Sequence, residues 1–173
     1  MTILATLCYV EDGDRVLMLH RNKREGDWHR GRYNGLGGKF LPGEGPEACM
    51  VREVREESGL EAEAWLLKGA LTFPAFDGVN DWQCFIYRIT RWRGNLQPCE
   101  EGTLEWVPRQ KLDSLPLWPG DRVFLPLVFE PEGWFSGVFR YVDKALADWE
   151  LWHYTAAGVT RRSGDGLSTE AFR

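Results

Sequence analysis

A chain of 173 residues with 43% hydrophobic and 27% charged residues is long enough to form one globular domain with a substantial core. The formal net charge of −5 argues against a binder of polymeric nucleic acid or of membranes, and it would repel a phosphate-bearing ligand unless a cation mediated the contact. The four cysteines include no CxxC pair and acidic residues interrupt the apolar N-terminus, so we expect a reduced, cytoplasmic protein with neither a zinc site nor a membrane span.

The predicted elements begin with a β-hairpin. Residues 3–10 and 15–21 are apolar runs, and the Glu-Asp-Gly-Asp segment that joins them contains a typical turn signal. Residues 22–38 follow as a polar loop that is rich in glycine and arginine. This loop leads directly into the strongest helix signal of the chain.

That helix is predicted over Pro46–Ser58. Pro46 suits the first helical position, Glu47 suits the first turn, and Gly59 stands where a left-handed residue would end the helix. The end signals lie close to the helix in the sequence, so its boundaries are well defined.

The two faces of this helix differ in character. Hydrophobic residues recur every three positions and are expected to face the core: Ala48, Val51 and Val54. At about 100° per residue, the opposite side carries three glutamates: Glu53, Glu56 and Glu57. Like charges at this spacing cost about 0.2–0.5 kcal/mol per pair. Taken alone, such a row is usually a solvated face.

The second half of the chain alternates strand and helix signals. Four segments are strand-like: 62–73, 81–90, 102–108 and 134–142. Residues 120–129 favour a second helix, although Pro126 lies inside it. Residues 143–154 are ambiguous.

The domain is expected to span residues 1–154. The tail, residues 155–173, has almost no apolar content and is predicted to be flexible. Strands before and after a helix, followed by a second helix, indicate an α/β (α+β) fold with a mixed β-sheet sandwiched between helices.

One set of residues matches a catalytic sequence motif. Gly38, Glu44, the run 52–57 (Arg-Glu-Val-Arg-Glu-Glu) and the pair 59–60 (Gly-Leu) match G-x5-E-x7-R-E-U-x-E-E-x-G-U at every specified position, where U is aliphatic. This pattern is the Nudix box, and the chain therefore resembles the Nudix hydrolases. The resemblance implies the Nudix fold, with a loop–helix–loop catalytic motif.

The resemblance also implies a metal centre. Clustered carboxylates are hard oxygen ligands that suit Mg²⁺, with Mn²⁺ as an alternative, and the cation would relieve the like-charge penalty. The ligands that the resemblance implies are the box glutamates, the backbone carbonyl of a glycine and a distal glutamate: Glu53, Glu56, Glu57, Gly38 and Glu101. Glu100 competes for the distal position, and an exposed turn carboxylate is the alternative for both.

Two kinds of supporting residue can be named. Arg52 and Glu44 are expected to orient the carboxylates rather than to touch the substrate. Lys39 and Arg21 either contact phosphate oxygens or are ordinary solvated cations.

Two further stretches resemble the MutT-type Nudix enzymes that remove oxidised purine nucleoside triphosphates from the nucleotide pool. They are residues 31–39, Gly-Arg-Tyr-Asn-Gly-Leu-Gly-Gly-Lys, and residues 115–121, Leu-Pro-Leu-Trp-Pro-Gly-Asp. By this resemblance Asn34 would hydrogen-bond the base and Trp118 would stack on it. The alternatives are a turn residue and a core aromatic residue.

One position departs from that pattern. The resemblance leads us to expect two consecutive aspartates after the Trp-Pro pair, but the chain has Gly120 followed by Asp121. Asp121 either reads the base or caps the following helix, and Phe73 either lines the base pocket or packs in the core. A single carboxyl group offers the base fewer hydrogen bonds than two, so this departure weakens the expectation of selectivity for an 8-oxo base.

The expected activity is Mg²⁺-dependent hydrolysis of a nucleoside triphosphate, such as 8-oxo-dGTP, to the monophosphate and pyrophosphate. The alternative is a Nudix pyrophosphatase that acts on ADP-ribose, a dinucleoside polyphosphate or a nucleotide sugar. A Nudix-fold module that binds nucleotides without cleaving them usually has a degraded box, and here the box is intact. The expected partner is the nucleotide substrate, and the sequence does not indicate an oligomeric state.

Overall fold

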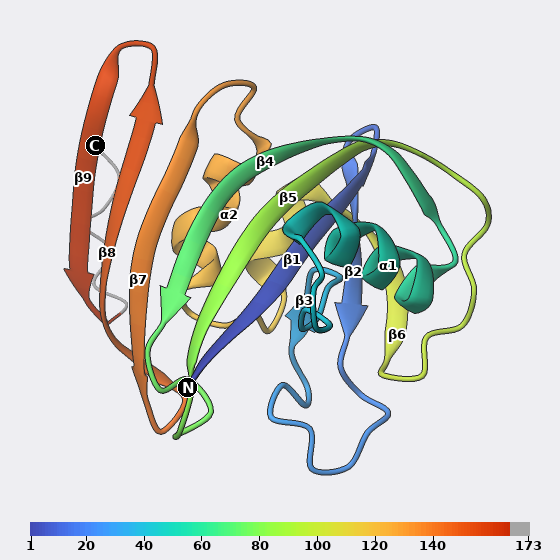
Figure 1. Cartoon of the computed structure of the whole chain (residues 1–173), viewed down its shortest axis with the longest axis horizontal. Coiled ribbons are helices and arrows are strands. Elements are labelled where there is room, and N and C mark those ends of the chain that lie inside the picture. The colour runs from blue at the N-terminus through green and yellow to red at the C-terminus, as the bar shows by residue number, and fades with distance from the viewer. Residues whose placement is uncertain (167–173) are drawn as a thin grey trace.

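The computed structural model describes residues 1–166 as one mixed sheet with helices on its faces (Figure 1). In chain order the elements are β1 (Thr2–Asp12), β2 (Arg15–His20), β3 (Tyr33–Asn34), α1 (Pro46–Ser58), β4 (Glu61–Phe73), β5 (Asp81–Arg93), β6 (Thr103–Pro108), the 3₁₀ helix η1 (Arg109–Ser114), α2 (Asp121–Phe129), β7 (Trp134–Val142), β8 (Ala145–Thr155) and β9 (Gly158–Asp165). All strand and helix segments predicted from the sequence form, with small shifts of their ends.

The sheet has the strand order β3-β2-β1-β5-β4-β7-β8-β9, and β6 also pairs with β2. The β1–β5 and β4–β7 pairs are parallel, while the others are antiparallel. Figure 1 shows α1 on the near face over β1 and β5, and α2 behind β4 and β5. The predicted sandwich of a mixed sheet between helices is confirmed.

The domain has two hydrophobic clusters, one on each face of the sheet, and the predicted hairpin of β1 and β2 contributes residues to both. On β2, Val16 and Met18 are buried in the cluster on the α2 side, whereas Leu17 and Leu19 are buried in the cluster on the α1 side. Successive strand residues point to opposite faces, so a continuous apolar run is what a strand buried on both faces requires.

The ends of α1 agree with the prediction, but its core face does not. Gly59 is left-handed (φ 77°) and its N–H donates to the Arg55 carbonyl oxygen at 2.8 Å. Ala48 is exposed and Val51 is 36% exposed, so the prediction that they face the core is wrong. Val54 is buried as predicted, and Cys49 and Met50 complete the buried stripe in place of Ala48 and Val51.

The C-terminal part of the domain also differs from the expectation. The ambiguous segment 143–154 forms most of β8, and residues 158–165 form β9, which pairs along β8. A flexible tail was therefore the wrong prediction for these residues, while residues 167–173 lie outside the described part of the chain. The β9 strand carries no core residue. The backbone ladder and an Arg161–Glu150 ion pair hold it in place, and neither produces an apolar pattern in the sequence.

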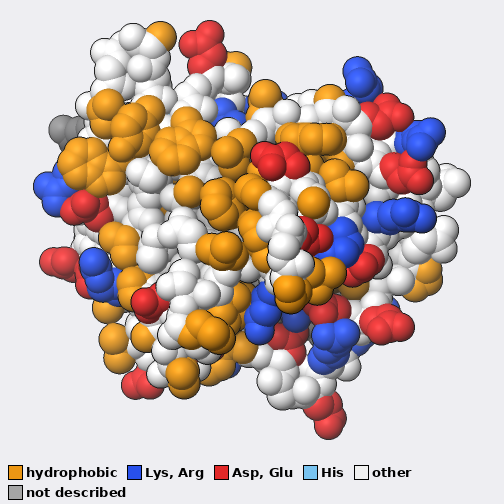
Figure 2. Space-filling view, viewed as in Figure 1, with side chains coloured by type: hydrophobic (Ala, Val, Ile, Leu, Met, Phe, Trp, Pro, Cys, Tyr) orange, Lys and Arg blue, Asp and Glu red, His pale blue; other side chains and the backbone are white. Residues whose placement is uncertain are grey.

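Within residues 1–166, no helix is both long enough and apolar enough to cross a membrane. On the face that carries α1, basic and acidic side chains are interspersed around the helix (Figure 2). On the left of the same view, hydrophobic side chains gather over the β7–β9 end of the sheet.

Candidate active site

The loop of residues 35–39 is fixed to β1. Backbone hydrogen bonds join Cys8 to Leu36 in both directions (2.6 and 2.9 Å), and the Thr6 N–H donates to the Gly38 carbonyl oxygen (2.9 Å). Gly37 has φ 137°, and a Cβ atom there would collide with the Thr6 carbonyl group, so only glycine suits this close approach. This anchoring aims the Gly37 N–H at the side of α1.

The three box glutamates occupy different environments along α1. Glu56 is exposed (62% of its side chain), Glu53 is largely covered (14%), and Glu57 is buried. The Glu57 carboxylate accepts a hydrogen bond from the Gly37 N–H at 2.7 Å. Glu57 was expected on the side opposite the core, and it is buried there because the loop of residues 35–39 covers it.

Arg52 joins the carboxylates. Its guanidinium group makes a bidentate pair with Glu44 (both contacts 2.8 Å) and donates to Glu53 (2.6 Å) and Glu56 (3.3 Å). The contact with Arg52, followed by the Leu41 N–H, lowers the pKa of Glu44 to about 2. One planar five-donor group thus restrains three acidic side chains, which is the geometry expected of an orienting residue.

Two of the box glutamates have raised pKa values. Burial raises the pKa of Glu57 to about 8, against the lowering effect of the Gly37 N–H, and the negative charges of Glu101 and Glu53 raise it further. The pKa of Glu53 is also raised, first by burial and then by Glu56 and Glu101, although Arg52 opposes this. A divalent cation among these groups would lower both pKa values, because it favours the ionised carboxylates.

Glu101, the predicted distal carboxylate, is held by two arginines. Arg21 and Arg24 both pair with it, the latter at 2.5 Å, and Arg21 also binds Asp27 at 2.7 Å. Within residues 1–166, no three acidic, histidine or cysteine side chains are already gathered around one metal position. A cation would therefore have to compete with Arg52 and Arg21 for their carboxylates.

Two other predicted residues have defined surroundings. The Gly38 carbonyl oxygen accepts hydrogen bonds from the Thr6 N–H (2.9 Å) and the Cys49 thiol (3.5 Å), so its lone pairs are already engaged. The Lys39 ammonium group lies over the Trp82 ring, 4.9 Å from the centroid. Lys39 therefore has an aromatic partner, which an ordinary solvated lysine does not need.

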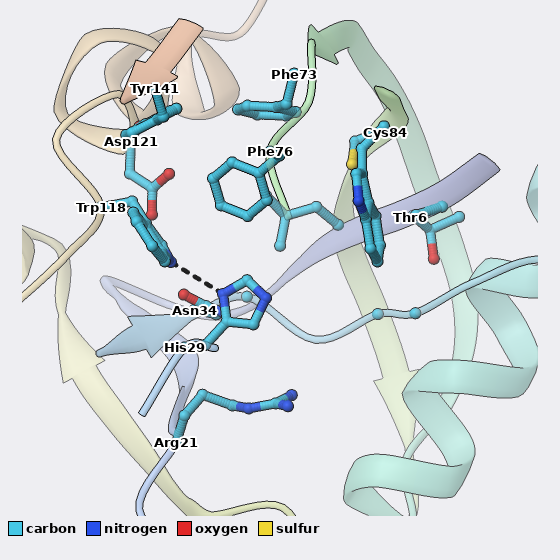
Figure 3. Close-up of a pocket in the computed structure, with 16 residues that line it drawn as sticks. Thr6, Arg21, His29, Asn34, Phe73, Phe76, Cys84, Trp118, Asp121 and Tyr141 are labelled. Carbon is cyan, nitrogen blue, oxygen red and sulfur yellow. Dashed lines mark hydrogen bonds between the residues drawn. The ribbon is translucent and has the colours of Figure 1, made fainter. Parts of the chain in front are cut away.

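A cavity of about 130 Å³ adjoins the carboxylates, and Gly37 and Gly38 form part of its wall (Figure 3). Its other residues come from several separate segments of the chain, and five of them are Phe, Trp or Tyr: Phe73, Phe76, Trp82, Trp118 and Tyr141. Five of the predicted substrate-binding residues line it together: Arg21, Asn34, Phe73, Trp118 and Asp121. The volume is below the roughly 300–1,000 Å³ of a pocket that encloses a whole ligand. It suits one ring system of a larger molecule.

Trp118 is buried and held on several sides. Its indole N–H donates to His29 Nδ1 at 3.0 Å, and the Arg32 guanidinium carbon lies 4.2 Å from the indole centroid. Burial, followed by the charge of Arg21, lowers the pKa of His29 to about 4, so the imidazole is neutral and its Nδ1 accepts this bond. The indole is both a core residue and a wall of the cavity, so the two roles considered for it coexist.

Asn34 has an unpartnered acceptor. Its Oδ1 atom is buried and accepts no hydrogen bond from any residue in the part of the chain that the structure describes. A buried polar atom without a partner costs about 1–3 kcal/mol. A ligand that presents an N–H group to this side of the cavity would remove that cost.

Asp121 is buried at the start of α2. Gly120 is the residue before the first helical turn, and no side chain caps this helix, so the capping alternative for Asp121 is not supported. Burial raises the pKa of Asp121 to about 7, against the lowering effects of Arg32, the Trp118 backbone and Arg122. Near neutral pH this carboxyl group can therefore exist in both the donor and the acceptor form.

Replacing Asp121 with asparagine should make stability less dependent on pH. The folded-state pKa of about 7 lies above the unfolded value of about 3.9. The protonated Asp121 carboxyl group therefore contributes stability that is fully present below about pH 4 and is lost as the pH rises through 7. Between pH 4 and pH 8 the unfolding free energy of the native chain should fall by roughly 2–4 kcal/mol relative to Asp121→Asn.

Urea denaturation of both proteins at a series of pH values measures this difference. Asp113→Asn, at an exposed position of η1, is the matched control and should follow the native chain. Parallel stability curves for the native chain and Asp121→Asn would mean that Asp121 has an ordinary pKa.

Some residues of the cavity were not foreseen from the sequence. His29 and Phe76 come from loops, and Tyr141 comes from β7, far along the chain from the box. Phe76 packs edge-on against Trp118 (centroids 5.0 Å apart) and Tyr141 (5.3 Å). No local pattern marks these positions, because only the tertiary fold brings their segments together. Arg21, which was predicted, also lines the cavity.

The chain is similar to known proteins over most of its length. The family model described as NUDIX domain matches residues 1–128. The uncharacterized Nudix hydrolase YvcI of Bacillus subtilis (strain 168) is 33% identical over 143 residues, which cover 80% of this chain and 87% of that protein. An oxidized purine nucleoside triphosphate hydrolase of Mus musculus is 30% identical over 141 residues, or 82% and 88% of the two chains. The crystal structure of a MutT protein from Bacillus halodurans has a TM-score of 0.76 and 30% identity, and the match covers 86% of this chain and 97% of that one.

Proposed function

Because the chain belongs to the NUDIX domain family and is a Nudix hydrolase of the MutT type, we propose that it hydrolyses a purine nucleoside triphosphate to the monophosphate and pyrophosphate. The preferred base is an oxidised purine such as that of 8-oxo-dGTP. The relative from Mus musculus is named as an oxidized purine nucleoside triphosphate hydrolase, which supports this choice of substrate.

One observation carries the proposal. The carboxylate cluster and the aromatic cavity share a wall, because Gly37 donates its N–H to Glu57 and also lines the cavity beside Asn34 and Trp118. A molecule that places a base in the cavity would therefore extend its phosphates towards α1. The small volume of the cavity fits this division, with the base inside and the triphosphate outside.

The acidic residues fit a divalent metal. Glu53, Glu56, Glu57 and Glu101 offer hard oxygen donors. A cation would also offset the like-charge repulsion that adds to burial in raising the pKa values of Glu53 and Glu57. Mg²⁺, or Mn²⁺ in its place, would supply charge neutralisation at the phosphates and polarisation of the attacked phosphorus when bound. The Gly38 carbonyl oxygen already has two donors, so we assign the metal to the carboxylates alone.

The other residues position the reacting groups. Arg52 holds Glu53 and Glu56 in place and is itself fixed by Glu44. Lys39 and Arg21 lie at the border of the cavity and would meet phosphate oxygens as they leave it. Asn34 Oδ1 would accept an N–H of the base, while Trp118 would stack on its face.

A panel of nucleotides with Mg²⁺ tests the proposal. We expect kcat/KM to be highest for 8-oxo-dGTP or 2-hydroxy-dATP, lower for dGTP, and lowest for ADP-ribose and a diadenosine polyphosphate. The ordering follows from a cavity that holds one base and has a free N–H acceptor in its wall. Faster cleavage of ADP-ribose or of the dinucleotide than of every triphosphate would overturn the assignment and favour the pyrophosphatase alternative.

A further inference from the structure

Gly120 has no room for a side chain. A Cβ atom at this position would lie 2.6 Å from the Tyr141 hydroxyl oxygen and 2.8 Å from a ring carbon of Phe139. The space that an aspartate side chain would take is therefore filled by two aromatic residues of β7. Tyr141 thus occupies space that the carboxylate side chain of an aspartate at position 120 would need.

The Tyr141 hydroxyl is fixed by its neighbours. The Gly120 N–H donates to its oxygen at 2.8 Å, and its ring packs edge-on against Trp118 (5.5 Å, 84°) and Phe76 (5.3 Å, 80°). Figure 3 places Tyr141 beside Asp121 on the wall that carries Trp118. The hydroxyl thus sits at the aromatic end of the cavity, held by a backbone contact and two rings.

The proton of this hydroxyl is uncommitted. Its oxygen accepts from Gly120, and among residues 1–166 the O–H group has no hydrogen-bond acceptor. Burial, with a further contribution from the charge of Asp121, raises the pKa of Tyr141 well above its ordinary value, so the phenol keeps its proton at neutral pH. The group can therefore act as a donor towards the cavity but is poorly placed to accept a second hydrogen bond.

We propose that Tyr141 is a specificity-determining residue whose hydroxyl donates a hydrogen bond to an oxo group of the substrate base, taking the place of the aspartate that Gly120 excludes. The inference rests on the proposed function, since it names the group that reads the base in the same site. A carboxyl group can donate or accept according to its protonation, whereas this phenol can only donate. The site should therefore favour an oxo group over an amino group at the position that faces Tyr141.

Tyr141→Phe tests the proposal by removing one oxygen atom and keeping the ring. We expect kcat/KM for 8-oxo-dGTP to fall about 5- to 150-fold, the usual range for losing one buried polar contact to a substrate. Tyr154→Phe is the matched control, because Tyr154 lies on β8, is 39% exposed and is outside the cavity. It should leave every rate unchanged.

Two pairs of substrates separate a direct contact from a structural role. 8-oxo-dGTP and dGTP differ in the oxo group at C8, while dGTP and the 2,6-diaminopurine deoxyribonucleoside triphosphate differ by oxo against amino at C6. If Tyr141 contacts the oxo group at C8, Tyr141→Phe should lower kcat/KM strongly for 8-oxo-dGTP and less than about twofold for dGTP. If it contacts the oxo group at C6, kcat/KM should fall strongly for dGTP and less than about twofold for the diaminopurine nucleotide. The thermal unfolding temperature of the variant shows whether the freed Gly120 N–H disturbs the fold.

Each outcome decides a different claim. If Tyr141→Phe slows all three triphosphates equally, or slows none of them, the inference is wrong while the proposed function stands. If the native chain cleaves none of them in the presence of Mg²⁺, the proposed function fails and the inference fails with it.

Discussion

Replacing Glu56 with glutamine should lower kcat/KM about 1000-fold and leave the thermal unfolding temperature of the metal-free protein nearly unchanged. The side chain is 62% exposed, and its contact with Arg52 is a single bond of 3.3 Å, so the fold depends little on it. A bound cation stabilises the transition state of phosphoryl transfer by several kcal/mol, and each 1.36 kcal/mol corresponds to a factor of ten in rate. Loss of one charged ligand should remove most of this stabilisation.

The experiment needs one readout other than activity. If Mg²⁺ at about 100 times its Kd binds only the folded state, it adds about 2.7 kcal/mol to the stability. That corresponds to a rise of roughly 5–10 °C in Tm for a chain of this size. Glu56→Gln and Glu57→Gln should both lose most of this rise.

Glu132→Gln, at an exposed position between α2 and β7, is the matched control. It should keep both the rate and the Mg²⁺-induced rise in Tm. Near-normal turnover in Glu56→Gln and Glu57→Gln would remove these residues from the metal site.

Replacing Arg52 with glutamine should lower kcat/KM about 100-fold, at the upper end of the 10- to 100-fold effect typical of residues that orient metal ligands. The change releases Glu44, Glu53 and Glu56 together, since Arg52 contacts all three. Arg52→Lys should lose nearly as much, because an ammonium group cannot make the bidentate pair with Glu44 while also reaching Glu53.

Arg55 provides a matched control on the same helix. It is exposed, so Arg55→Gln removes the same charge without releasing the box carboxylates. We expect its kcat/KM to stay within about twofold of the native value. Equal losses of kcat/KM in Arg52→Gln and Arg55→Gln would mean that catalysis depends only on the number of positive charges on α1. In that case the arrangement of contacts around Arg52 would not be what orients the carboxylates.

Local signals explain why some of the structure was predictable. Pro46 and Gly59 set the ends of α1 through their own backbone preferences, which do not depend on the rest of the fold. The two-sided burial of β2 follows in the same way from a continuous apolar run.

Features that depend on tertiary contacts were not predictable. The burial of Glu57 depends on the loop of residues 35–39 returning to β1 across a long sequence separation. Packing of α1 against the sheet decides which face of the helix is buried, so Ala48 and Val51 were assigned to the wrong side. The periodicity of a helix indicates that it has an apolar face, but small errors in phase move residues at the edges of that face.

The cavity contains some residues that were predictable from the sequence and others that were not. Asn34, Trp118 and Asp121 were singled out by resemblance to known sequences, and the fold brings them to one cavity. Tyr141 could not be found in that way, because its role depends on the absence of a side chain at Gly120. The departure from the family pattern was visible in the sequence, while the residue that fills the vacated space was visible only in three dimensions.

The most direct test of the central claim is the identity of the products formed from 8-oxo-dGTP. We expect 8-oxo-dGMP and pyrophosphate in equal amounts when Mg²⁺ is present and no products when the cation is removed with EDTA, because the proposed function requires the carboxylates of α1 to act through a bound cation. Chromatography with phosphate analysis distinguishes these products from others. Release of the diphosphate and orthophosphate, or cleavage that continues unchanged in EDTA, would contradict the proposed function.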